Sequence, residues 1–203
     1  MFYRFAKWVT TIVRFFLVDV TYIGQENLPE QGGYIVACNH RSMWDPVLLA
    51  QGMRRQINFM GKAELFSNVF LRCLMNLLGV ISVDRGTGDS NAITRSEEVI
   101  RRGGLLGIFP EGTRSPDGKP LRPKSGMALI ARATGAGIIP CAVVYEKKTG
   151  LHRRPIRVKY GKPIPYEELG FGDDQGTASL KRVSKLVMGR IIDMMELPPE
   201  EQS

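Results

Sequence analysis

The stretch YIVACNHRSMWDP, residues 34–46, has the form of a strand, a loop and the first turn of a helix. YIVAC is a short apolar run with β-branched residues, which is typical of a buried strand. Pro46 favours the start of a helix, because its ring fixes φ near the helical value and its missing N–H would be unpaired there in any case. The stretch therefore predicts a strand–loop–helix unit, the repeating element of α/β proteins.

The same alternation continues along the chain. Apolar runs typical of strands lie at residues 57–61, 80–84, 105–109, 137–145 and 156–161. Helix-prone segments lie at residues 46–53, 63–79, 90–102, 125–134 and 178–196. Strands that alternate with helices predict an α/β fold with a mostly parallel central sheet flanked by helices.

Length and composition indicate a globular protein with anionic partners. The 203 residues fit one main domain, and a hydrophobic fraction of 43% is enough for a buried core. The net charge of +8 favours phosphate-bearing small molecules, anionic lipid or nucleic acid as partners. Cys38, Cys73 and Cys141 are far apart in the chain, so we expect reduced thiols in core or strand positions. Two histidines and no Cys-x-x-Cys pair argue against a structural zinc site, and we predict no bound metal.

Residues 1–22 are predicted to form an amphipathic helix ahead of the main domain, residues 23–203. On a helical wheel Arg4, Lys7 and Arg14 share one stripe, and aromatic and aliphatic residues fill the wide remaining arc. The longest uninterrupted apolar run, FFLV, is too short to cross a membrane. Such a helix suits the headgroup layer of an anionic membrane. Docking on the protein's own core or in a dimer is the alternative.

His40 and Asp45 stand five positions apart in the loop after the first predicted strand. A histidine can take a proton from a hydroxyl group, and a carboxylate beside it can fix its tautomer and stabilise the imidazolium that forms. Asp45 directly before Pro46 is also a good N-cap for the predicted helix. The stretch alone leaves two interpretations open, a catalytic pair or a helix cap.

A second loop, FPEGTRS at residues 109–115, follows another predicted strand. Arg114 can bind a phosphate through two parallel hydrogen bonds, and Gly112 lets a ligand approach the backbone closely. Lys62 and Arg85 each come directly after a further predicted strand, and loops at the carboxyl ends of parallel strands meet at one edge of a sheet. These residues form a candidate anion site. The alternative is a β-turn and solvated surface charges.

Five segments occur in order along the chain: NHRSMWD, KAEL, GVISVDR, FPEGTRS and IIPCAVV. Together they resemble the ordered motifs of the glycerophospholipid acyltransferase family, in particular the small bacterial 1-acylglycerol-3-phosphate acyltransferases. NHRSMWD looks like the N-H-x4-D motif, and FPEGTRS matches the third motif almost letter for letter. The resemblance runs from Asn39 to Val144, within a motif core of residues 34–146. Ser82 departs from the pattern, since relatives commonly carry a bulky apolar or aromatic residue there.

The resemblance implies that His40 is a general base and that Asp45 orients it. His40 would deprotonate the sn-2 hydroxyl of lysophosphatidic acid, whose oxygen would attack an acyl thioester directly and give phosphatidic acid. No covalent acyl-enzyme and no cofactor are expected, and the donor is acyl-CoA or an acyl-carrier-protein thioester. The residues implied to hold or shape the phosphate site are Lys62, Arg85, Glu111, Gly112, Thr113 and Arg114.

The resemblance also implies a peripheral or monotopic location at the cytoplasmic face of the cell membrane. One alternative keeps the same catalytic pair and changes the acceptor to glycerol 3-phosphate or another lysophospholipid. A second is a non-catalytic protein that binds anionic lipid or nucleic acid through its positive charge. The basic residues are dispersed, and the chain lacks an RNP-like aromatic block and zinc-finger spacing, so we expect no nucleic-acid partner.

Overall fold

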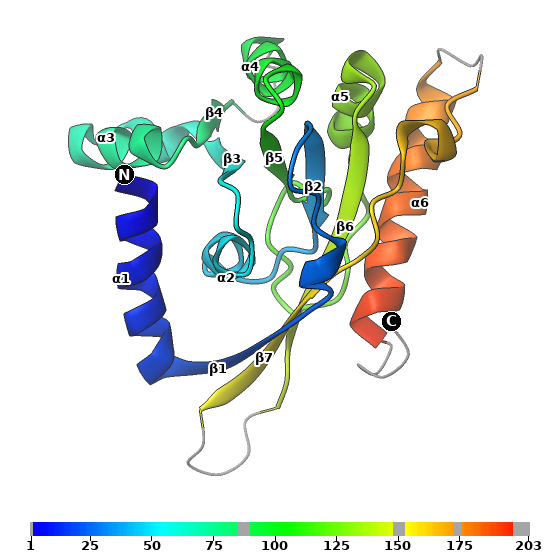
Figure 1. Ribbon diagram of the computed structural model, residues 1–203. Coiled ribbons are helices and arrows are strands. Elements are labelled where there is room, and N and C mark those ends of the chain that lie inside the picture. The colour runs from blue at the N-terminus through cyan, green and yellow to red at the C-terminus, as the bar shows by residue number, and fades with distance from the viewer. Residues whose placement is uncertain (1, 85–89, 148–152, 173–175, 197–203) are drawn as a thin grey trace.

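A computed structural model describes residues 2–84, 90–147, 153–172 and 176–196. Its centre is a seven-stranded sheet in the order β1-β7-β6-β2-β5-β3-β4 (Figure 1). The strands are β1 (Val18–Ile23), β2 (Tyr34–Cys38), β3 (Ile57–Lys62), β4 (Ile81–Val83), β5 (Leu105–Ile108), β6 (Gly137–Tyr145) and β7 (Arg154–Tyr160). The neighbours β6, β2, β5, β3 and β4 are parallel, whereas β7 runs antiparallel to β6 and pairs in parallel with β1. The prediction of a mostly parallel α/β fold is confirmed.

Helices cover both faces of this sheet. They are α1 (Phe2–Leu17), α2 (Asp45–Gln51), α3 (Val69–Leu77), α4 (Ser90–Arg101), α5 (Gly126–Thr134) and α6 (Thr177–Glu196). Ile35 and Ala37 of β2 belong to the core shared with α4, α5 and α6. Val36 and Cys38 belong to a second core, which includes residues of α2. Successive side chains of a strand point to opposite faces, so the four buried residues 35–38 of β2 supply both cores.

The prediction for residues 1–22 is wrong at its C-terminal end. Helix α1 ends at Leu17, and the following residues form β1, which pairs with β7 from Val18 opposite Arg154 to Ile23 opposite Lys159. The β-branched residues of VDVTYI fit a pleated strand, and pairing with β7 supplies their backbone hydrogen bonds. The amphipathic helix is therefore continuous with an edge strand of the sheet.

The helix predicted over residues 63–79 is interrupted. A 3-10 turn spans Ala63–Phe66, and the side chain of Asn68 then accepts the backbone N–H groups of Phe70 and Leu71, which caps a new helix, α3. Cys73 lies exposed on α3, so the expectation that every cysteine occupies a core or strand position is wrong for this residue. The cysteines of β2 and β6 are buried as expected.

Gly107 of β5 offers a test of the packing between β5 and β3. It lies opposite Phe59, and a Cβ at this position would come 2.4 Å from the Phe59 ring. We expect Gly107→Ala to lower the free energy of unfolding by about 1–3 kcal/mol, because the ring must move within a packed region. Gly189 of α6 has open space at its Cβ position, so Gly189→Ala should raise that free energy by about 0.5–1 kcal/mol. Urea unfolding measures both changes, and equal stabilities of the two variants would contradict the packing.

Candidate active site

His40 and Asp45 meet in the loop between β2 and α2. Nδ1 of His40 lies 2.9 Å from Oδ2 of Asp45, whose side chain is fully buried, while the His40 side chain is 13% exposed. An ionised carboxylate only accepts hydrogen bonds, so the proton of the neutral ring sits on Nδ1. Nε2 has no hydrogen-bond partner among the described residues. Its lone pair can therefore accept a proton from a bound alcohol.

The loop itself holds the Asp45 carboxylate. Oδ2 also accepts the backbone N–H groups of Arg41 at 2.7 Å and Ser42 at 2.6 Å, and Oδ1 accepts the hydroxyl of Tyr145 at 2.5 Å. These donors compensate a charge that would be costly to bury unpaired. Asp45 is the first residue of α2 and Trp44 is the N-cap, so the prediction of an Asp45 cap is wrong. The carboxylate binds amides that precede the helix, because it also has to reach His40.

The FPEGTRS loop positions His40 from the other side. The ring of Phe109 stacks on the imidazole, with centroids 3.9 Å apart and planes 16° from parallel. The backbone N–H of His40 donates to Oε1 of Glu111 at 2.9 Å, and its carbonyl accepts the N–H of Ser115 at 2.8 Å. The loop thus fixes one face of the ring and both backbone groups of His40.

Glu111 is a buried support of this loop. Its second oxygen, Oε2, accepts the N–H of Leu121 at 3.0 Å, and the residue is 3% exposed. Burial raises the pKa of Glu111, and the two amide hydrogen bonds oppose that shift. Because both oxygens bind backbone amides, the geometry gives Glu111 a structural task in the loop. Its predicted contribution to a phosphate pocket stays a prediction.

Lys62, Thr113 and Arg114 lie at the same edge of the sheet as His40. Lys62 ends β3, and the loop with Thr113 and Arg114 follows β5, which lies between β3 and β2. All three side chains are exposed, and Nζ of Lys62 lies 2.8 Å from a carboxylate oxygen of Glu64. Lys62 and Arg114 therefore lie at the same edge of the sheet as the catalytic loop, and binding of substrate by them stays a prediction.

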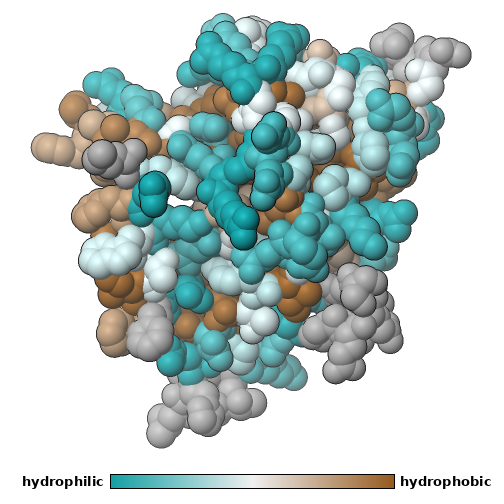
Figure 2. Space-filling view, viewed as in Figure 1, coloured by the Kyte–Doolittle hydropathy of each residue, from teal (hydrophilic) through white to brown (hydrophobic). Residues whose placement is uncertain are grey.

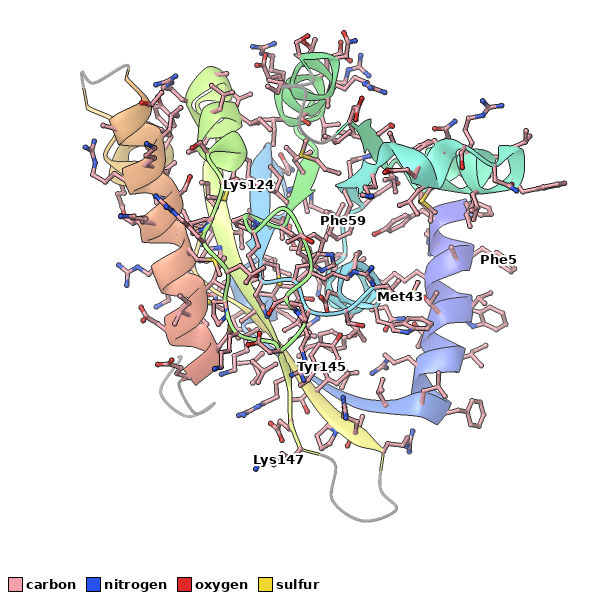
Figure 3. The ribbon with its side chains drawn as sticks, turned by 180° about the vertical axis from the view of Figure 1, so that it is seen from behind. Phe5, Met43, Phe59, Lys124, Tyr145 and Lys147 are labelled. Atoms are coloured by element: carbon pink, nitrogen blue, oxygen red, sulfur yellow. The ribbon has the colours of Figure 1, made fainter. Side chains whose placement is uncertain are left out.

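Gly112 and Arg85 complete the predicted site. Gly112 has φ +71, a left-handed conformation that side chains disfavour, and its missing side chain leaves room for the stem of Lys124. A Cβ at Gly112 would come 2.9 Å from Cδ of Lys124, which Figure 3 shows at this loop. Arg85 lies outside the described residues. Within the described ranges, no group of three or more His, Cys, Asp or Glu could hold a metal ion.

The sequence did not indicate two contacts that complete the site. The Asn39 side chain donates to the carbonyl of Val143 at 3.0 Å and accepts its N–H at 2.8 Å, which ties the end of β2 to β6. Tyr145, two residues further, reaches Asp45. The only available signal was its position at the carboxyl end of a predicted strand, since no motif includes it.

Comparison with known proteins identifies the family. A family model described as "Acyltransferase" matches residues 19–144, from the second residue of β1 to the last but one of β6. The chain belongs to this acyltransferase family. The match confirms the resemblance suggested by the five ordered segments, and it includes the catalytic loop, the FPEGTRS loop and Val143.

Two relatives in the family carry the name 1-acyl-sn-glycerol-3-phosphate acyltransferase. The Bacillus subtilis protein is 30% identical over 69% of this chain, which covers 70% of that protein. The Streptococcus pneumoniae protein is 27% identical over 87% of this chain, which covers 67% of that protein. The fold is similar to the crystal structure of the 1-acyl-sn-glycerophosphate (LPA) acyltransferase, PlsC, from Thermotoga maritima. That likeness has a TM-score of 0.68 at 23% identity and covers 89% of this chain and 74% of the other.

Substitutions at Glu111 test its role as a support. Glu111→Ala leaves the N–H groups of His40 and Leu121 without their partner, and each such loss costs about 1–3 kcal/mol. Glu111→Gln keeps one acceptor oxygen and should lose less. We expect thermal stability and catalytic rate to fall in the order wild type, Gln, Ala. If the Gln and Ala variants match each other in both measurements, the two amide bonds do not hold the loop.

Proposed function

We propose that the protein transfers an acyl group from an acyl thioester to the sn-2 hydroxyl of 1-acyl-sn-glycerol-3-phosphate, giving phosphatidic acid. The observation that carries this proposal is the hydrogen bond between His40 and a fully buried Asp45, with Nε2 of the ring left to face substrate. Membership of the acyltransferase family and the names of both relatives support this acceptor and this reaction.

In this reaction His40 moves one proton. Nε2 accepts the proton of the acceptor hydroxyl as the hydroxyl oxygen attacks the thioester carbonyl carbon. Asp45 stabilises the imidazolium through Nδ1. When the tetrahedral intermediate collapses, the carbon–sulfur bond breaks and the imidazolium returns its proton to the departing thiolate. The products are an ester and a free thiol, and His40 is regenerated.

Direct transfer suits the chemistry of the neighbouring thiol. Cys38 lies two residues before His40 and is fully buried. Burial raises the pKa of Cys38 well above its usual range, and the charges of Asp45 and Glu111 add to the shift. A thiol held in its neutral form is a poor nucleophile, so it does not compete with the acceptor alcohol for the acyl group.

We infer that Lys62, Arg85 and Arg114 bind the acceptor phosphate, while Gly112 and Thr113 shape the loop around it. Support comes from the exposure of Lys62 at the end of β3 and of Arg114 in the loop after β5, and from the net charge of +8. Arginine can bind the phosphate through two parallel hydrogen bonds, whereas lysine acts as a point charge. The donor is acyl-CoA or acyl-carrier-protein thioester, and the reaction needs no cofactor.

Helix α1 turns its polar side inward. The Lys7 ammonium donates to the carbonyl of Met53, Thr10 accepts a hydrogen bond from Gln51, and the Arg14 guanidinium lies over a tyrosine ring of β1. Burial lowers the pKa of Lys7. The expectation that the basic stripe of α1 faces lipid headgroups is therefore wrong for Lys7 and Arg14. These residues bind the protein, and the apolar side of the helix faces outward.

The outward side of α1 and the surface of α3 form one exposed apolar region, here called the apolar face. Its members are Phe5, Trp8, Val9, Ile12, Phe16 and Leu17 of α1 with Leu65, Val69, Phe70, Leu71, Leu74 and Leu77 at α3. Figure 2 shows hydrophobic residues along the margin where α1 and α3 lie, and Phe5 projects away from the sheet in Figure 3. Among the described residues, no helix is long and apolar enough to cross a membrane.

We infer that the apolar face binds one leaflet of an anionic membrane as a peripheral or monotopic contact, at the cytoplasmic face of the cell membrane. Met43 is 72% exposed and Trp44 is 46% exposed in the same loop as His40, so the catalytic loop is itself apolar at its tip. Exposed apolar area of this extent marks a site of protein or membrane contact. A lipid acceptor favours the membrane, because the acceptor's acyl chain already resides there.

Removal of the base or of its partner tests the proposed reaction. We expect His40→Ala to lower the rate by about 10²- to 10⁴-fold, because the proton of the substrate alcohol then has no base to receive it. Asp45→Asn should also lower the rate, since an amide stabilises the imidazolium poorly. The assay measures thiol release from acyl-CoA and from acyl-carrier-protein thioester. It is repeated with lysophosphatidic acid, glycerol 3-phosphate and other lysophospholipids, and the rates show which acceptor the protein uses. Equal thiol release by wild type and His40→Ala with every donor would refute the proposal.

Charged substitutions in the apolar face test membrane binding. Trp8→Glu and Phe70→Glu should each weaken binding to phosphatidylglycerol vesicles by about tenfold or more, because burial of one such side chain is worth about 1.5–3 kcal/mol. Leu186→Glu, an exposed position of α6, is the matched control and should bind as wild type does. Vesicle flotation measures all three. Undiminished flotation of the Trp8 and Phe70 variants would show that the apolar face does not touch lipid.

A further inference from the structure

The Asp45 carboxylate has two oxygens with different partners. Oδ2 faces His40 and also accepts the loop amides of Arg41 and Ser42. Oδ1 accepts the hydroxyl of Tyr145 at 2.5 Å, a distance normal for a hydroxyl that binds an ionised carboxylate. In the described part of the chain, Tyr145 is the one donor to Oδ1. The hydroxyl on Oδ1 therefore acts together with the two amides on Oδ2 to fix which carboxylate oxygen is turned to the base.

The end of β6 places this hydroxyl. Tyr145 is the last residue of β6, and two residues earlier the Asn39 side chain binds both backbone groups of Val143. Cα of Tyr145 also pairs with Ile156 across β6 and β7. The backbone that carries Tyr145 is therefore held by its neighbours on both sides in the sheet.

Arg41 and Ser42, in the same loop as His40, contact the Tyr145 side chain. Arg41 directly follows His40 in the sequence. Its guanidinium lies over the Tyr145 ring, 5.4 Å from the ring centre. Burial and the charge of Asp45 raise the pKa of Tyr145 well above its usual range, and a hydrogen bond with the Ser42 side chain opposes that shift. The phenol therefore stays protonated, and so a hydrogen-bond donor, at neutral pH.

We propose that Tyr145 is a positioning residue of the catalytic pair, whose hydroxyl holds Oδ1 of Asp45 so that Oδ2 stays aligned with Nδ1 of His40. This inference rests on the proposed acyl transfer by His40. Without the hydroxyl, Oδ1 is left buried without its donor, and only the bonds of Oδ2 to the two loop amides and to His40 still resist rotation of the carboxylate. The alignment of Oδ2 with Nδ1 is then less strictly held, and with it the orientation of the imidazole toward the acceptor alcohol. Tyr145 acts on the base through Asp45, whose Oδ1 its hydroxyl binds.

The test compares Tyr145→Phe with Tyr160→Phe. Both changes remove one hydroxyl from a buried or half-buried tyrosine and keep the ring, but the Tyr160 hydroxyl binds the carbonyl of Leu49 at 2.7 Å and does not contact Asp45. We expect Tyr145→Phe to lower kcat by about 10- to 100-fold, the loss of one hydrogen bond to a charged group. KM for lysophosphatidic acid should change by less than about twofold, because the phosphate site is unaltered. Tyr160→Phe should keep kcat within about twofold of wild type.

A double variant separates positioning from general loss of stability. Once Asp45 is Asn, there is no carboxylate for the hydroxyl to hold. Tyr145→Phe should therefore lower kcat further by less than about twofold in the Asp45→Asn background. A full, independent effect of Tyr145→Phe in that background would overturn the inference, as would a kcat of Tyr145→Phe equal to that of Tyr160→Phe.

Proton NMR gives a readout that does not depend on the acceptor. The Nδ1 proton of His40 should give a low-field signal in wild type and in Tyr160→Phe, and the signal should broaden or vanish in Tyr145→Phe. An unchanged signal in Tyr145→Phe would refute the positioning role. If the wild type shows no acyl transfer to any acceptor, the proposed function fails, and the NMR comparison still decides whether Tyr145 orients the pair.

Discussion

The buried charge of Asp45 is the constraint on which the rest of the site depends. A carboxylate with no exposed surface needs donors on both oxygens, and here they come from two parts of the chain. The loop after β2 supplies two amides and the His40 ring, and the end of β6 supplies the Tyr145 hydroxyl. The same set of bonds therefore satisfies the charge, shapes the loop and orients the base. Support for His40 from Phe109 and Glu111 completes a site built on the carboxyl ends of adjacent strands.

The active site and the apolar face are connected through the contacts between α1 and α2. In helix α1, Lys7 binds the carbonyl of Met53 just after α2, Thr10 binds Gln51 of α2, and Arg14 lies over a tyrosine ring of β1. Helix α2 begins with Asp45. The helix that is proposed to meet the membrane is thus attached to the helix that carries the catalytic carboxylate. An amphipathic helix normally buries its apolar side in its own protein. The apolar side of α1 is exposed here instead, as the proposed contact with one membrane leaflet requires.

Sequence patterns predicted those features that follow from local chemistry. Apolar runs in the chain located β2 to β7, and the spacing of His40 and Asp45 in a strand-to-helix loop located the pair. Features that depend on distant partners were missed. Residues 18–23 have a helical neighbour in sequence, and only pairing with β7 makes them a strand. The role of Glu111 and the hydroxyl of Tyr145 depend on groups 71 and 100 positions away, which no local pattern reports. The inward side of α1 likewise depends on partners in β1, in α2 and just after α2.

In the proposed reaction His40 acts as a base on the acceptor alcohol and never carries the acyl group. Rapid mixing of the protein with acyl thioester in the absence of acceptor, followed by thiol detection and intact-protein mass spectrometry, tests for an acyl-enzyme. Direct transfer predicts no burst of thiol and an unmodified protein mass, with thiol and phosphatidic acid appearing in equal amounts once lysophosphatidic acid is added. A burst of one thiol per protein molecule, together with a mass increase equal to one acyl group, would contradict it.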